Sequence, residues 1–200
     1  MKKFNLTLTN LTEPTPESVK LLGLAWNRKQ DTLSTRSLHL DNKANTKRLI
    51  LKTIAAHYDV FGFTLPLLNR AKLFLHKLQC DSSLKWDSRL SDELLREWKN
   101  ITNQFNASPN IEINRFMGRR GGKFRLIAFT DSSKEIYGTV VFIQDLDSLK
   151  VSFVLAKNRI VNKQLSNKSM PSLEFQGITF GTEVLIDLFR NFLVLLVSTL

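Results

Sequence analysis

Apolar residues recur along the chain with two different spacings, which divide the sequence into a helical part and a strand part. From residue 45 to residue 105 many apolar positions lie three or four residues apart, the spacing of one helix face. From residue 123 they gather in short runs typical of strands, and a helical spacing returns near residue 169. We therefore predict an α+β protein, in which a small helical unit is followed by three antiparallel strands and a helix.

Capping and turn residues refine the helical part. Ser91 is a favourable N-cap residue, and Pro66 suits the first turn of a helix because it lacks the backbone N–H that would otherwise go unpaired there. Gly62 breaks the pattern between two helices. We predict helices at residues 47–58, from Pro66 to about 78, and from Ser91 to about 105. We expect His57 to pack in the first helix and Trp26, Trp86 and Trp98 to anchor cores.

The remaining elements are read from runs bounded by polar turns. We predict strands at 19–26, 32–38, 124–130, 137–143 and 151–156, with a hairpin loop at 27–31 and a last helix from 169 to about 191. The composition of residues 106–122 is that of a linker. The predicted organisation is a hairpin segment at 1–44, a helical unit at 45–105, a linker at 106–122 and a strand-and-helix domain at 123–200.

Composition limits the class of protein. The chain has 42% hydrophobic and 24% charged residues, as expected for a globular protein, and its net charge of +11 favours a polyanionic partner. The single cysteine, Cys80, excludes an internal disulfide. Met1 is not followed by an apolar signal segment, and the apolar run at 192–197 falls short of the ~20 residues of a membrane span. We expect an intracellular protein outside the membrane.

Asp131 is the first candidate for chemistry. It ends a predicted strand rich in Ile, Phe and Leu, where an acid is costly to bury unless it is paired or binds a metal. Asp131 is followed by two serines, so it also suits an ordinary turn. The strand alone does not decide between these interpretations.

Glu174 is the second candidate, in the first turn of the last predicted helix. An acid there can simply complement the helix dipole. At ~100° per residue, however, Glu174 shares a face with Ile178, Gly181 and Leu185, and we expect that face to pack on the sheet. Two carboxylates brought together repel unless a divalent cation lies between them, and Mg²⁺ prefers such oxygen ligands.

Basic residues gather in three places that could contact phosphate groups without reading sequence. For any single cluster, solvated surface charge is an equally good interpretation. The candidate nucleic-acid-binding residues are Lys47, Arg48, Lys52, Arg119, Arg120, Lys123, Lys157 and Arg159.

Several of these stretches resemble one family. Residues 129–141 (FTDSSKEIYGTVV) together with 170–175 (MPSLEF) are similar to the ribonuclease H region of BEL/Pao LTR retrotransposon polyproteins. Residues 19–27 (VKLLGLAWN), 47–63 (KRLILKTIAAHYDVFGF), 84–87 (LKWD) and 94–98 (LLREW) resemble the same family, in the same order.

The resemblance implies a fragment of a Pol protein, with a palm-exit segment, a thumb-like and connection-like helical unit and the first half of ribonuclease H. It implies that Asp131 and Glu174 are two of four carboxylates that bind Mg²⁺ or Mn²⁺ and cleave RNA–DNA hybrid. The other two carboxylates and the polymerase Tyr-x-Asp-Asp motif are absent from the sequence. We therefore expect a truncated site that is inactive by itself.

Two other functions stay open. The first is binding of nucleic acid without catalysis, which the net charge favours. The second is an aspartic peptidase acting as a dimer, because this region of the family is also catalogued as a peptidase. The peptidase needs an Asp-Thr/Ser-Gly turn, whereas Asp131 is followed by Ser132 and Ser133 without the glycine. We expect partners among RNA–DNA hybrids, other nucleic acids and the rest of a Pol polyprotein.

Overall fold

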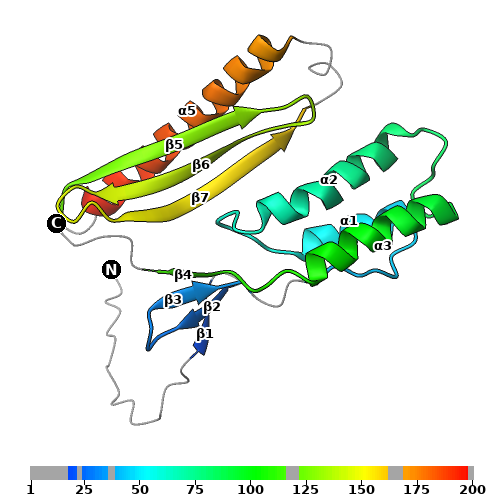
Figure 1. Ribbon diagram of the computed structural model, residues 1–200, viewed down its shortest axis with the longest axis horizontal. Coiled ribbons are helices and arrows are strands. Elements are labelled where there is room, and N and C mark those ends of the chain that lie inside the picture. The colour runs from blue at the N-terminus through cyan, green and yellow to red at the C-terminus, as the bar shows by residue number, and fades with distance from the viewer. Residues whose placement is uncertain (1–17, 22–23, 36–38, 116–121, 162–168, 198–200) are drawn as a thin grey trace, which may run out of the picture.

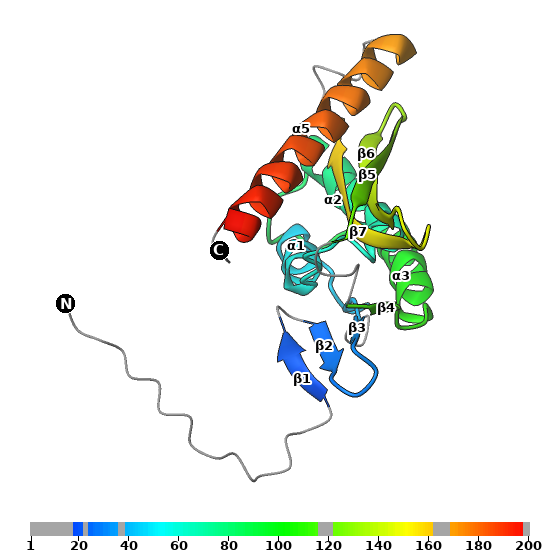
Figure 2. The same cartoon turned by 90° about the vertical axis from the view of Figure 1, so that its left-hand side faces the viewer.

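The structure is a computed structural model that describes residues 18–21, 24–35, 39–115, 122–161 and 169–197, the last seven by their backbone alone. The described residues form four helices and two antiparallel sheets, which confirms a mixed α+β protein. Figure 1 shows the helical unit beside one sheet, and a smaller sheet below them. Figure 2 shows helix α5 running along the larger sheet.

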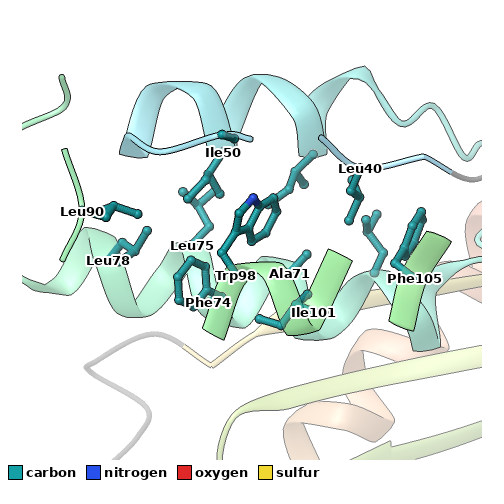
Figure 3. Packing of buried hydrophobic residues seen from close by; sticks show 13 residues of the cluster. Leu40, Ile50, Ala71, Phe74, Leu75, Leu78, Leu90, Trp98, Ile101 and Phe105 are labelled. Carbon is teal, nitrogen blue, oxygen red and sulfur yellow. The ribbon is translucent and has the colours of Figure 1, made fainter. Parts of the chain in front are cut away.

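The helical unit consists of α1 (Lys47–Ala56), α2 (Leu65–Cys80) and α3 (Asp92–Asn106). The predicted N-cap is confirmed, since the Ser91 hydroxyl accepts a hydrogen bond from the Leu94 N–H at 3.4 Å. Trp98 is completely buried where the three helices meet, as seen in Figure 3. Its ring stacks on Phe74 with centroids 5.6 Å apart, and its indole N–H donates to the Asp41 carbonyl at 3.0 Å.

The connection between α1 and α2 attaches the helical unit to the larger sheet. The Asp59 carboxylate accepts hydrogen bonds from three backbone N–H groups, of Gly62, Phe63 and Thr64, and from the Thr64 hydroxyl. Gly62 adopts φ +77°, and a side chain there would collide with the Ala156 carbonyl of the sheet. This is the break between two helices that the sequence predicts, and both the turn and the close approach require glycine.

The larger sheet has three long strands, β5 (Phe124–Ser132), β6 (Ile136–Asp145) and β7 (Val151–Ile160), in the order β5-β6-β7, whereas the smaller sheet has four short ones. All three are longer than predicted. Helix α5 (Met170–Val197) packs on β5 and β6, burying Leu173, Phe180 and Val184 against one face. On the other face Phe153 contacts Phe63 of the α1–α2 connection, with ring centroids 5.0 Å apart.

The smaller sheet contains the predicted hairpin around residues 27–31, but it corrects the extent of the first strand and adds a strand inside the predicted linker. Residues 19–26 do not form one strand, because β1 (Ser18–Leu21) pairs antiparallel with β2 (Leu24–Asn27). Beyond them, β3 (Thr32–Ser34) pairs with β4 (Glu112–Asn114), which lies inside the predicted linker. The sequence misled because an apolar run with a glycine looks like one strand, and because β4 is too short to show a period. Residues 36–38 lie outside the described part.

Candidate metal centre and nucleic-acid interface

Asp131 lies near the end of β5 and is exposed. Its neighbours Thr130 and Ser132 face α5, since a side chain at Gly181 would collide with Thr130 and one at Gly177 with Ser132. Because successive side chains of a strand point to opposite faces, the Asp131 carboxylate is directed to the face away from α5. One of its oxygens accepts the Ser132 N–H at 2.8 Å.

The two glycines let α5 lie unusually close to β5. Gly177 meets Ser132 and Gly181 meets Thr130, so α5 runs antiparallel to β5 and begins beyond its Ser132 end. The contact is tight enough to leave the Ser132 and Thr139 hydroxyls buried without a hydrogen-bond partner among the described residues. The two glycines can be read from the sequence, but the two unpaired hydroxyls could not be foreseen from it.

Glu174 is exposed, which corrects the expectation that it packs on the sheet. The buried stripe of α5 runs through Leu173, Gly177, Phe180 and Val184. Glu174 lies one residue, or ~100°, from Leu173 and so falls at the border of that stripe. Ile178, which was expected to share the packed face, is 56% exposed. Gly181 and Leu185 of the predicted face do pack towards the sheet, whereas Glu174 and Ile178 lie outside the buried stripe.

Asp131 and Glu174 therefore occupy the same end of the sheet but are not turned towards one another. Glu174 precedes Gly177 by about one helical turn, and Gly177 lies beside the Asp131 carbonyl. Among the described residues, no group of three or more His, Cys, Asp or Glu side chains is placed to hold a metal ion. Asp145 pairs with Phe124 at the far end of the sheet, so it does not join the pair.

Asp131 instead borders a groove that the sequence did not reveal. A cavity of about 410 Å³ lies between the sheet face carrying Asp131 and the start of α2. Leu65, Pro66 and Asn69 line it from the helix, and Phe129 and Gly138 line it from the sheet. No local pattern links residues 65–69 with 129–138, so the packing of α2 beside the sheet was the missing information.

Two of the candidate phosphate contacts are already engaged inside the protein. Lys47 is buried, and its ammonium group donates to the carbonyls of Asp81 and Leu84 at 3.1 and 2.7 Å. Arg48 forms a two-point ion pair with Asp87, at 2.6 and 2.9 Å, and the hydrogen bonds from Arg48 hold the pKa of that carboxyl below its usual range. Lys47 is thus a structural residue, because its ammonium group is hydrogen-bonded to backbone carbonyls and is not available to a phosphate group.

The other basic candidates in the described part are exposed. They are Lys52 on α1, Lys123 before β5, and Lys157 and Arg159 on β7. The Arg159 guanidinium lies over the Phe180 ring at 4.7 Å, so it is held at the sheet edge by a cation–π contact. Arg119 and Arg120 lie outside the described residues.

The larger sheet has three sequential antiparallel strands followed by a helix across one face, which is the element order that the resemblance to ribonuclease H implies. Comparison with known families agrees, since the model of the Pao retrotransposon-like RNaseH-like domain matches residues 46–198. The chain belongs to this family. The match runs through α1–α3 as well as through the larger sheet. No curated protein matches the sequence, and in the described part no helix combines the length and apolar character of a membrane span.

Proposed function

We propose that the chain handles nucleic acid as part of a retrotransposon Pol protein, binding RNA–DNA hybrid on the side of β5–β7. The family match over residues 46–198 carries this proposal, and the net charge of +11 supports it. Phosphate contacts come from exposed cations, namely Lys52, Lys123, Lys157 and Arg159. Lys47 takes no part because its ammonium group is buried on two carbonyls.

Asp131 and Glu174 are the two carboxylates that could take part in metal-dependent hydrolysis. In ribonuclease H-like enzymes a divalent cation such as Mg²⁺ or Mn²⁺ activates water and stabilises the leaving oxygen. Asp131 and Glu174 supply the right donor type at one end of the sheet, but their side chains diverge across it. We propose that they bind such a cation weakly and that the chain by itself cleaves hybrid at or near background.

Binding without efficient cleavage is therefore the activity that the arrangement supports best. Exposed lysines and arginines require no convergence to contact a phosphate backbone, whereas a metal centre requires its carboxylates to converge. Other portions of a Pol protein are the expected partners for any complete reaction.

The test uses the full chain with a labelled RNA–DNA hybrid. Fluorescence anisotropy should show an affinity that falls steeply with salt, and Lys157→Gln should lower the slope of log affinity against log salt by about 1. An affinity that does not change between about 50 and 200 mM salt would contradict the electrostatic account of binding.

The same samples test cleavage in Mg²⁺ and in Mn²⁺. The hybrid should remain intact. If it is cut slowly, the unaltered protein, Asp131→Asn and the matched helix variant Glu183→Gln should all cut it at the same rate. Fast cleavage that Asp131→Asn abolishes and Glu183→Gln preserves would show a working metal centre and overturn this part of the proposal.

A further inference from the structure

Phe129 is an aromatic side chain in an unusual position. It is 61% exposed although it lies on a nine-residue strand within the larger sheet. Its ring makes an edge contact with Phe142, with centroids 6.1 Å apart, which supports one side of the ring. Single exposed apolar residues need no explanation, but Phe129 also lines the cavity beside Asp131. The ring is thus both held and accessible.

The register of the sheet gives the groove an apolar row and a polar row. Phe129 pairs with Val140, which pairs with Ala156, and these form the apolar row. Two positions further along the strand, about 7 Å away, Asp131 pairs with Gly138, which pairs with Asn158.

Gly138 leaves the middle of the polar row bare. A side chain at this position would press on the Lys157 carbonyl at 3.1 Å and on Asn158 at 3.2 Å. At the far side of the row the Asn158 amide donates to the Asn69 side chain of α2. The groove therefore offers a flat ring next to a shallow floor flanked by amide and carboxylate groups.

The size and surroundings of the groove favour one kind of occupant. Its volume of about 410 Å³ lies within the roughly 300–1,000 Å³ of small-ligand sites, enough for a nucleotide-sized group. Arg125 is exposed on the same face of β5 as Phe129, four positions earlier, where it can contact a chain of phosphates. An aromatic ring with polar groups beside it and a cation further along the same strand face is a combination suited to single-stranded nucleic acid.

We propose that this groove binds an unpaired nucleotide of single-stranded RNA or DNA, whose base stacks on Phe129 while its phosphate chain runs along β5 towards Arg125. The inference rests on the proposed nucleic-acid function and adds to it a single-strand subsite next to Asp131. A stacked base is recognised by its flat face, so the subsite accepts all bases.

The experiment measures binding of labelled 12-nucleotide oligo(U) and oligo(dT) to the full chain by anisotropy, in EDTA so that cleavage cannot contribute. Phe129→Leu keeps an apolar side chain but removes the flat ring, and should weaken binding about 5- to 150-fold. Phe129→Trp should retain affinity, because it restores a stacking surface. Phe189→Leu is the matched control, since Phe189 is 60% exposed on α5; it should change affinity less than twofold.

A second probe does not depend on any variant folding. An oligomer of the same length whose sugars lack bases keeps every phosphate, and the unaltered protein should bind it about as weakly as Phe129→Leu binds oligo(U). Equal affinity for the abasic and the natural oligomers overturns the subsite while leaving the proposed function standing. If the protein binds neither single strands nor hybrid at low salt, the proposed function and the subsite both fail.

Discussion

The helical unit and the α5–sheet unit solve the packing problem in different ways. The helical unit closes around Trp98, and α1, α2 and α3 all turn apolar residues towards that ring. In the α5–sheet unit only one side of the helix is covered, and the side away from the sheet exposes Phe175, Ile178, Ile186 and Phe189. The helical unit buries its apolar residues in a closed core, whereas the α5–sheet unit leaves apolar side chains and the carboxylates of Asp131 and Glu174 exposed to solvent. Asp131, Phe129 and Glu174 all belong to this second region, on the sheet and on α5.

The largest expected effect breaks the closed core. Trp98→Ala removes a completely buried indole and leaves the Asp41 carbonyl without its donor, so the free energy of unfolding should fall by about 3–5 kcal/mol. Trp86→Ala is the control. Trp86 is 45% exposed, contrary to the expectation of a core anchor, and its loss should cost less than about 1 kcal/mol. Chemical denaturation of both variants decides; equal losses would contradict a core centred on Trp98.

An intermediate effect tests the close approach of α5. Gly181→Ala gains helix propensity of up to about 1 kcal/mol, but its methyl group meets the Thr130 side chain, which is stiff because it branches at Cβ. We expect a net loss of about 1–2 kcal/mol from overpacking. Adding Thr130→Ser removes the clashing methyl group and should recover most of the loss in thermal unfolding. If Gly181→Ala alone raises stability, the helix is not held as closely as described.

The smallest effect concerns His57, which caps the C-terminal end of α1. Its ring nitrogen lies 2.9 Å from the Thr64 hydroxyl, and its ring meets Phe105 edge-on. Burial lowers the pKa of His57; Asp59 acts to raise it, and Lys72 to lower it. The unfolded chain, with a histidine pKa of about 6.5, therefore takes up the proton first as the pH falls.

Stability should accordingly decrease as the pH drops below about 6.5 and level off below the folded-state pKa. His57→Gln keeps a side-chain donor but has no titrating ring. The stability of this variant should therefore vary less than that of the unaltered protein between about pH 7 and pH 5, where a histidine titrates. Denaturation midpoints of the two proteins across that range provide the measurement. Parallel pH curves would assign the dependence to other groups.

Much of the fold was accessible from the sequence because its signals are local. The N-cap at Ser91, the apolar spacing of the three helices and the break at Gly62 each act within a few residues, and the structure contains all three. The β3–β4 pairing was missed because it joins short segments far apart in the chain. A strand of three residues, such as β3 or β4, is too short for its hydrophobic periodicity to indicate which strand it pairs with.

The candidate sites were only partly accessible for a related reason. Residue type identified Asp131 and Glu174, but burial and direction decide what a carboxylate can do, and these depend on which side of α5 meets the sheet. Lys47 shows the same limit. Its place in a basic cluster indicated phosphate binding, whereas the carbonyls of Asp81 and Leu84, contributed by a distant loop, occupy its ammonium group.

The pairing of β3 with β4 has a consequence for how the chain finds its register. Thr32 and Glu112, whose side chains are hydrogen-bonded, stand 80 positions apart, and the loop between them contains the entire helical unit. Closing a flexible loop of that length is entropically costly, but a folded helical unit already brings its ends together, through the bonds between Leu40 and Asn106. The alignment of these two short strands is therefore inherited from helix packing and is not encoded in the strands themselves.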